Sequence, residues 1–482
     1  MAADAKRAPA LFDPTSFETF RFVARELDAS GRVTLHYALD HQVSFIERFD
    51  LPVASALSDD ERRRVEGLLA LLHWVAGVSY FKTALPPQVS CETGAPGPAA
   101  AALLEALYSE GLGELAYTNH LHGLPRPRFA ARPGSAASLG SAASLGSDVS
   151  SGSTPARVVP APGREDEQSL ERVLVPVGGG KDSAVALEVV RRSGLELALF
   201  SVGDAPPIAR TVAVAGLPRL LARRQLDPGL IALNSAGAIN GHVPITAIVS
   251  CVALLSAALN GFDAVALANE RSASAGNVVW DGVEVNHQFS KGLRAERLLA
   301  AAAAEAMDSA PRLFSVLRPA SELAIARAFT RLERYHSAFT SCNAIFRSDP
   351  ALRASSWCCE CPKCRFVFLA LAPFSEPEHL RAVFGRDLLE EEDQFEGFAL
   401  LTATGGHKPF ECVGEEQESL AAIRLLARDE RWSGHSVLRR LLAEVLPRFP
   451  AGEGDPEQVL ALGDEHAVPP ALLTSVRALL GA

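Results

Sequence analysis

Residues 178–183 read GGGKDS, and their types and spacing suit the binding of phosphate. Glycine lets a backbone approach a ligand without a Cβ atom in the way, and successive N–H groups in such a turn form a nest for an anion. A carboxylate there can bind Mg²⁺, and a serine hydroxyl can contact a phosphate oxygen. The spacing is neither GxxxxGK(S/T) nor GxGxxG. We expect phosphate to be held by Gly178, Gly179, Gly180, Lys181, Asp182 and Ser183, with Asp182 on Mg²⁺.

Four of the eight cysteines crowd into one short segment, and Cys342 precedes them. The spacing of Cys358, Cys361 and Cys364 can wrap one ion, and Cys342 supplies a fourth thiolate. A closed set of four thiolates is typical of a structural Zn²⁺ site. Cys359 competes with Cys358 as a ligand, and the even spacing favours Cys358. Free buried thiols, an iron–sulfur cluster and cysteines for sulfur transfer are the alternatives.

The glycine turn lies between a strand and a helix in the predicted fold. Short apolar strands are expected at 173–177, 197–202, 230–234 and 264–269, and helical intervals at 182–194, 210–225 and 245–261. Strands that alternate with helices indicate an α/β fold with a doubly wound parallel sheet. In such sheets, ligands bind at the carboxyl ends of the strands.

Polar residues stand at these strand ends. Ser201 lies near the end of the second strand and is a candidate ligand contact. Asn234 ends the third strand. Asn269, Glu270 and Arg271 end the fourth strand and are further candidate contacts. For these last three residues, the alternative is an ordinary turn after a strand. For the GGGKDS motif, the alternative is a glycine turn that binds no ligand, and for Lys181 it is a solvated side chain.

Composition limits the class of protein. The chain has 482 residues and a net charge of −11, so no global basic field is available to hold a nucleic acid. The segment closest to a membrane span, 245–259, is too short and contains Ser, Thr and Cys. The N-terminus lacks a hydrophobic signal core, and the clustered cysteines suit a reducing compartment. We expect a soluble cytoplasmic protein that binds neither nucleic acid nor membrane.

The chain divides into regions of different composition. Alternating polar and apolar residues over 16–53 predict strands, and Ser58 and Glu61 have the spacing of a capping box that opens a helix. A tandem SAASLG repeat marks a segment with little that could form a core. The predicted regions are an N-terminal α+β domain (1–125), a flexible low-complexity linker (126–168), the sheet domain with the cysteine set (169–400), and a catalytic loop followed by a helical extension (401–482).

Two family resemblances follow from these motifs. GGGKDS resembles the SGGxDS loop of the N-type (PP-loop) ATP pyrophosphatases, with Gly178 where that family has Ser. That resemblance covers about 170–370 and implies the cleavage of ATP to AMP and pyrophosphate. It makes Ser201 a candidate contact for adenine or ribose, and Asn269, Glu270 and Arg271 candidates to meet the α-phosphate or a substrate carboxylate. The stretches VPVGGGKDS, ANERSAS, EVNHQFSK, WCCECPKCRF and HKPFECVGE together resemble the MurL family of ATP-dependent UDP-N-acetylmuramoyl-L-alanyl-L-glutamate epimerases, over most of the chain except the linker. The implied small molecules are ATP and this UDP-muramoyl dipeptide, with Mg²⁺ and a structural Zn²⁺.

The MurL resemblance implies that the α-carboxylate of the terminal glutamate is adenylated before its Cα is inverted. Adenylation removes the negative charge beside the Cα–H bond, so that an enolate can form. Inversion needs a base and a proton donor, and the enolate oxygen needs donors such as Lys. The candidates for proton transfer are Cys412, His407, Glu411 and Glu415, and those for stabilising phosphate or enolate are His287 and Lys291. Core packing is the alternative for Cys412, and polar surface for His287 and Lys291.

Three other functions remain open from the sequence. The first is a PP-loop enzyme that modifies a tRNA base, against which the net charge of −11 argues. The second is another carboxylate-adenylating enzyme, an amide or nitrile synthase, which would consume ammonia. The third is a zinc-stabilised nucleotide-binding module without turnover.

Overall fold

The computed structural model describes residues 12–132, 170–346, 353–354, 356–404 and 406–481. Apart from residues 126–132, the predicted linker lies outside the described residues. No helix within these described ranges is long and apolar enough to cross a bilayer.

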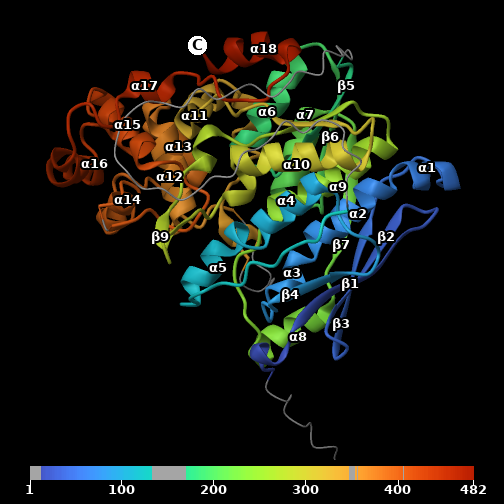
Figure 1. Ribbon diagram of the computed structural model, residues 1–482. Helices are drawn as coiled ribbons and strands as arrows, with labels where there is room; N and C mark the ends of the chain where they lie inside the picture. Colours follow the sequence, from blue (N-terminus) through green and yellow to red (C-terminus); the bar gives the residue numbers. More distant parts are fainter. Residues whose placement is uncertain (1–11, 133–169, 347–352, 355, 405, 482) are drawn as a thin grey trace, which may run out of the picture.

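Apart from a two-stranded antiparallel ribbon of β9 (Val278–Trp280) and β10 (Val283–Val285), the described strands form one nine-stranded sheet that runs through the molecule (Figure 1). Its strands in chain order are β1 (Thr19–Leu27), β2 (Arg32–Leu39), β3 (Val43–Asp50), β4 (Gln88–Cys91), β5 (Arg172–Pro176), β6 (Glu196–Val202), β7 (Arg219–Gln225), β8 (Ala264–Leu267) and β11 (Arg312–Ser315). Their spatial order is β11-β8-β5-β6-β7-β3-β2-β1-β4. Pairing is parallel from β11 to β7 and between β1 and β4, and antiparallel from β7 through β3 and β2 to β1. The fold is therefore α/β with a mixed, mostly parallel sheet.

The parallel part of the sheet reverses its order beside β5. The chain proceeds from β5 outward to β6 and β7, and later places β8 and β11 on the other side of β5. The two halves thus diverge between β5 and β8. Such a switch point leaves a crevice at the carboxyl ends of the strands, where doubly wound sheets bind ligands.

The third predicted strand was wrong, and so was the helical interval before it. Residues 230–234 lie in helix α8 (Pro228–Ala236), which Asp227 caps by accepting a hydrogen bond from the Gly229 N–H at 2.7 Å. Residues 210–225 contain the end of α7 (Pro206–Ala215) and then β7. Gly216, at φ 63°, ends α7 in the left-handed conformation, so the following apolar residues are free to extend. Asn234 consequently does not end a strand.

The N-terminal strands join the same sheet. β3 pairs with β7, and the buried Glu47 carboxylate accepts a hydrogen bond of 2.5 Å from the Arg224 guanidinium across this junction. Arg224 also donates to the Ser79 hydroxyl at 3.0 Å. Phe45 of β3 and Phe200 of β6 belong to one buried hydrophobic cluster. The first region and the parallel sheet thus share a core.

Helices surround the sheet and fill the C-terminal part of the chain. The N-terminal helices are α1 (Asp59–Arg64), α2 (Glu66–Ala76), α3 (Val78–Phe81), α4 (Pro98–Leu107) and α5 (Gly113–Thr118). The remaining helices are α6 (Lys181–Arg192), α9 (Ile245–Leu259), α10 (Leu293–Ala306), α11 (Glu322–Thr330), α12 (Pro362–Leu371), α13 (Pro377–Phe384), α14 (Phe395–Leu400), α15 (Glu416–Leu426), α16 (Ser436–Arg440), α17 (Pro456–Leu460) and α18 (Pro470–Leu480). The capping box of Ser58 and Glu61 opens α1 as predicted.

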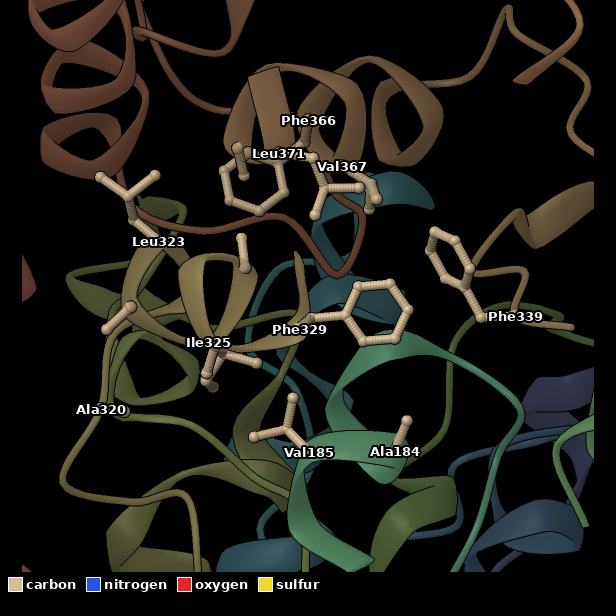
Figure 2. Packing of buried hydrophobic residues seen from close by; sticks show 14 of the residues in the cluster. Ala184, Val185, Ala320, Leu323, Ile325, Phe329, Phe339, Phe366, Val367 and Leu371 are labelled. Atoms are coloured by element: carbon tan, nitrogen blue, oxygen red, sulfur yellow. The ribbon is translucent and has the colours of Figure 1, made fainter. Parts of the chain in front are cut away.

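Helix α11 packs between α6 and α12 and fixes both. Figure 2 shows Val185 of α6 directed at α11, where Ile325 and Phe329 meet it, while Phe366 and Val367 of α12 approach α11 from the other side. All five side chains are buried. The first turns of α6 and α12 are therefore held in a fixed relation, and residues of both turns line the cavity described below.

Candidate active site

A cavity of about 370 Å³ lies at the switch point of the sheet, where the sequence analysis placed a ligand. It opens at the carboxyl ends of β5, β6 and β8. Predicted residues on its wall are Gly178, Gly180, Asp182, Ser183, Ser201, Asn269, Glu270, Lys291 and Cys412. The glycine turn, two strand ends, the proton-transfer candidate Cys412 and the candidate enolate stabiliser Lys291 thus share one cavity.

The glycine turn is built so that side chains are excluded where it bends. Gly179 has φ +82°, and a Cβ atom there would lie 2.5 Å from the carbonyl carbon of Pro207. Gly180 is the N-cap of α6, and its Cβ would lie 2.7 Å from the Ser341 hydroxyl oxygen. The Thr340 N–H donates to the Gly179 carbonyl at 3.0 Å. The turn therefore places the positive end of α6 at the cavity, a suitable position for an anion.

Lys181 points inward rather than into the cavity. Its side chain is fully buried and pairs with Asp182 and Glu322, and Glu322 also accepts from the Lys363 ammonium at 3.2 Å. Burial disfavours the charged amine, but the two carboxylates outweigh it and raise the pKa of Lys181. Lys363, on the cavity wall, is thus a second cation that the sequence analysis missed. Glu322 was missed too, because its only sequence signal is its place in the first turn of α11.

Two buried polar groups on the cavity wall lack a partner. Within the described chain, the Ser201 hydroxyl and the Asn269 amide nitrogen have no hydrogen bond, although these residues are 2% and 7% exposed. Buried polar atoms without a protein partner are uncommon and indicate a missing ligand or water. Burial and the nearby Glu322 charge raise the pKa of Glu270. Arg271, in contrast, turns away and donates to the carbonyl oxygens of Ala461 and Val459 at 3.0 and 3.1 Å, respectively.

Cys412 reaches the cavity with two cationic neighbours. Its sulfur lies 3.3 Å from the Lys291 ammonium and 3.6 Å from Nε2 of His287. Burial alone would raise the pKa of the Cys412 thiol, but Lys291 and His287 overcome it and lower this pKa to about 6. Burial disfavours the imidazolium, but the hydrogen bonds to Cys412 and Glu114 raise the pKa of His287 to about 9. Near neutral pH the sulfur is a thiolate that faces an imidazolium.

The other three candidates for proton transfer are placed elsewhere. His407 is exposed, with Nδ1 3.0 Å from the Lys408 carbonyl oxygen. Glu411 accepts hydrogen bonds from the Asn343 amide at 3.0 Å and from the backbone N–H of Lys363 at 3.1 Å. Glu415 is the N-cap of α15 in a reciprocal capping box. The described cavity wall includes none of these three, and Glu411 and Glu415 have local structural partners.

The predicted cysteine set comes together. The sulfur atoms of Cys342, Cys358, Cys361 and Cys364 all lie within 4.8 Å of one another, and Cys364 is 3.5 and 3.8 Å from Cys361 and Cys358, respectively. Four thiolates at 2.3 Å around one tetrahedral ion stand about 3.8 Å apart, so the set fits Zn²⁺. Cys359 is turned away, with φ +61° and its sulfur 3.5 Å from the Phe384 carbonyl oxygen.

The cysteine cluster also forms part of the cavity wall's support. Thr340, Ser341 and Asn343 flank Cys342, Lys363 lies between two of the other cysteines, and all four residues line the cavity. An ion bound by the cluster would therefore hold the loop before α12 and the first turn of that helix together.

Comparisons with known proteins identify the family. A sequence model of the MurL N-terminal domain matches residues 11–316, and one of the MurL C-terminal domain matches residues 338–454. A protein of Micromonospora sp. is 43% identical over 459 residues, which is 94% of this chain and 96% of that protein. A protein of Salinispora tropica is 44% identical over 435 residues (89% of each chain), and one of Xanthomonas oryzae pv. oryzae is 39% identical over 471 residues (97% of this chain and 98% of that protein).

All three relatives are named UDP-N-acetyl-alpha-D-muramoyl-L-alanyl-L-glutamate epimerase. No solved structure matches the chain. The identity extends over nearly the full length of each relative, and both family domains are matched in order. The chain belongs to the MurL family of epimerases.

Proposed function

We propose that this enzyme uses ATP to invert the terminal L-glutamate of UDP-N-acetylmuramoyl-L-alanyl-L-glutamate, and that the D-glutamyl product serves peptidoglycan precursor synthesis. Membership of the MurL family supports the substrate. One observation supports the mechanism above all others: the Cys412 thiol and the Gly178–Ser183 turn line the same cavity. A nucleotide phosphate and a proton-transfer group can therefore meet at one substrate carbon.

The proposed reaction begins with activation of the carboxylate. A carboxylate oxygen attacks the α-phosphorus of ATP, the bond from that phosphorus to the β-bridging oxygen breaks, and pyrophosphate leaves. The resulting acyl-adenylate lacks the carboxylate charge, so removal of the Cα proton gives an enolate instead of a carbanion beside a full negative charge. A proton returns to the opposite face, and water then cleaves the acyl–phosphate bond to release AMP and the D-glutamyl product.

In this proposal the glycine turn and Ser183 bind the phosphates at the N-terminus of α6, and the unpartnered Ser201 and Asn269 groups bind the nucleoside part. The PP-loop type of the sheet domain is part of the same proposal. Asp182 fits a Mg²⁺ ligand, since Mg²⁺ is usually held by one or two carboxylates together with substrate phosphates. Bound there, the ion would neutralise phosphate charge.

In this proposal, Lys291, Lys363 and Cys412 on the cavity wall carry out the proton transfer and stabilise the charge that it creates. Lys291 and Lys363 present ammonium groups where negative charge develops on the enolate oxygen or the α-phosphate. Cys412, as a thiolate, moves the Cα proton. The four clustered cysteines hold a structural Zn²⁺ that fixes the wall carrying Lys363. Because such a thiolate set needs a reducing compartment, we place the enzyme in the cytoplasm.

The test uses the UDP-muramoyl dipeptide with ATP and Mg²⁺ in D₂O. The product should contain D-glutamate with deuterium at Cα, because a thiol or an imidazolium exchanges its proton with solvent before returning it. Product that is inverted without deuterium, or labelled without inversion, contradicts the proposed proton transfers.

A matched pair of variants tests the nucleotide site. Asp182→Ala should abolish pyrophosphate release and leave the circular dichroism spectrum unchanged. Asp204→Ala, which removes an exposed carboxylate that pairs with Arg219 after β6, should release pyrophosphate at the normal rate. Release by Asp182→Ala would show that the glycine turn does not hold the nucleotide.

A further inference from the structure

Glu114 lies in α5, in the N-terminal region to which the sequence assigned no chemistry, yet it contacts the site. We infer that Glu114 is a positioning residue of the epimerase centre, whose carboxylate holds the His287 imidazole against the Cys412 sulfur. The N-terminal region then completes the catalytic site and does more than enclose the substrate. This inference rests on the proposed function and deepens it.

The contacts form a continuous chain from α5 to the cavity. A carboxylate oxygen of Glu114 lies 2.5 Å from Nδ1 of His287, whose Nε2 lies 3.6 Å from the sulfur of Cys412. The Glu114 and His287 side chains are each only 12% exposed, and Cys412 lines the cavity with Lys291. Charges alternate along this chain: carboxylate, imidazolium, thiolate, ammonium.

Hydrogen-bond accounting explains why the imidazole needs both neighbours. A carboxylate and a thiolate can only accept hydrogen bonds, so the ring satisfies both when each nitrogen carries a proton. The Lys291 ammonium donates to the same sulfur at 3.3 Å. With Glu114 fixing Nδ1–H, the ring cannot rotate about its Cβ–Cγ bond without losing a charge-assisted hydrogen bond. Nε2–H therefore stays directed at the sulfur.

Helix α5 is itself anchored to the segments that carry the other groups. The Asn119 amide at its end donates to the Asn240 carbonyl at 3.0 Å, and the Lys82 ammonium donates to the Asn240 side chain at 2.8 Å. The ring of Tyr117 in α5 lies 4.9 Å from that of Phe410, two residues before Cys412. In Figure 1, α5 accordingly lies beside the β9 ribbon and below the C-terminal helices. The Glu114 carboxylate is thus positioned by contacts of α5 with the segment around Asn240 and with the loop that carries Cys412.

A metal ion is the competing explanation, because Glu114, His242 and His287 each offer a ligand atom within 4.8 Å of the others. The distances oppose it. Ligand bonds of about 2.0–2.2 Å would hold the carboxylate oxygen and Nδ1 of His287 roughly 3 Å or more apart, whereas the observed 2.5 Å is a direct hydrogen bond. The ring of His242 lies beside that of His287, with centroids 4.5 Å apart and planes tilted by 44°. Burial lowers the pKa of His242 to about 4, so this ring adds no charge beside His287.

The charged or titratable groups that face this pair come from every surrounding segment. They are Glu114 and His242 beside His287, Lys291 and Lys363 beside Cys412, and Glu411 from the loop that carries Cys412. Removing the Glu114 charge makes the imidazolium easier to deprotonate, so the alkaline limb of the pH profile moves to lower pH. A less populated imidazolium stabilises the thiolate less, so the acid limb moves to higher pH. The active range narrows from both sides.

The experiment compares Glu114→Gln, Glu114→Asp and the matched control Glu110→Gln, which removes a nearby carboxylate that pairs with Arg294 at the surface. Each full-length variant is given the UDP-muramoyl dipeptide, ATP and Mg²⁺ in D₂O. Pyrophosphate release and deuterium at Cα are measured in the same samples across pH 5–10, and melting temperatures are recorded.

We expect Glu114→Gln to release pyrophosphate normally but to incorporate deuterium on the order of 10- to 100-fold more slowly. This loss is at or below the lower limit of what general acid–base catalysis contributes, because Glu114 acts only through His287. Its pH profile should narrow, Glu114→Asp should recover part of the rate, and Glu110→Gln should match the wild type.

Several results would overturn the inference. Glu114→Gln with a wild-type exchange rate and profile would remove Glu114 from the chemistry. If Glu114→Gln slows pyrophosphate release and deuterium exchange by the same factor and also lowers the melting temperature, Glu114 has only a structural role. Restoration of the wild-type enzyme's activity by Zn²⁺ or Mn²⁺ after chelation, with the metal lost only from Glu114→Gln, would make the trio a metal site. Absence of pyrophosphate release in the wild type would instead contradict the proposed function itself.

Discussion

The acidity of Cys412 depends strongly on the Lys291 ammonium group, which can be removed with little change of shape. Replacing Lys291 by Met deletes a positive charge 3.3 Å from the sulfur. Two unit charges at that distance interact by about 5 kcal/mol at an effective dielectric constant of 20, which corresponds to roughly 3 to 4 pKa units. The surroundings as a whole lower the thiol pKa from 9.0 to about 6. Without Lys291, burial should balance the remaining attractions, and the pKa of Cys412 should return to about 9.

The assay is pulsed alkylation with iodoacetamide across pH 4.5–10, read at the peptide that contains Cys412 by mass spectrometry. The midpoint should move from about pH 6 in the wild type to about pH 9 in Lys291→Met. The alkylation rate at pH 7 should fall only several-fold, because a more basic thiolate is more nucleophilic and offsets much of its lower population. The midpoint is therefore the decisive quantity.

Two controls accompany this measurement. Lys291→Arg keeps the charge and should keep the midpoint below pH 7. Cys91, whose pKa burial raises to about 12, should stay poorly reactive in every sample at neutral pH. A Lys291→Met midpoint that remains near pH 6, or a wild-type midpoint near pH 9, would refute the electrostatic reasoning.

Three further predictions concern the scaffold around the site. Glu322→Gln leaves two buried ammonium groups with one carboxylate and should destabilise the fold by about 3–5 kcal/mol in urea unfolding. Lys181 and Lys363 overcome the effect of burial and lower the pKa of Glu322 in the folded protein. The stability that the Glu322 carboxylate contributes should therefore be present at pH values above its pKa in the unfolded chain, and should be lost as the pH falls through its pKa in the folded protein. An acid-unfolding curve that is the same in Glu322→Gln as in the wild type would contradict this. Gly179→Ala forces a side chain to φ +82° against Pro207 and should cost about 1–3 kcal/mol, whereas Gly178→Ala meets open space and should cost under about 1 kcal/mol; equal urea midpoints would contradict this. Cys361→Ser should lose the proposed Zn²⁺ and several degrees of melting temperature, while Cys359→Ser should keep this metal. Zinc retained by Cys361→Ser, or lost from Cys359→Ser, would contradict the assignment of the four ligands.

Local sequence signals gave much of the sheet. The strand at 173–177, the glycine turn and the amphipathic helix after it form within about twenty residues, and the structure has them in place as β5, the turn and α6. The error at 230–234 shows the limit of such signals. A run of apolar residues suits either a buried strand or a helix. Here Asp227 as N-cap and Pro228 in the first turn are the signals that favour a helix.

Local sequence signals also could not predict that the N-terminal strands join the parallel sheet. β3 and β7 are separated by more than 160 residues, and an ion pair between the buried Glu47 and Arg224 spans their junction, which neither segment shows alone. A charged residue in a predicted strand, such as Glu47, is expected to face solvent unless its ion-pair partner is known. The sequence therefore predicted separate regions where the structure has a shared sheet and core.

By itself, the sequence determined two groups of residues that lie close together in the chain: the glycine turn, which we propose binds phosphate, and the cysteine set. Their geometry depends on backbone conformation over a few residues, which residue types specify directly. Only the tertiary structure decided which side chains meet across the cavity. Glu114, His287 and Cys412 are 173 and 125 residues apart in sequence. Helix α5, the segment after β10 and the loop before α15 must pack together before these residues touch. His407 and Cys412 look paired because they are close in the chain, but the fold exposes His407 and places the half-buried Cys412 on the cavity wall, since contact is set by packing and not by sequence distance.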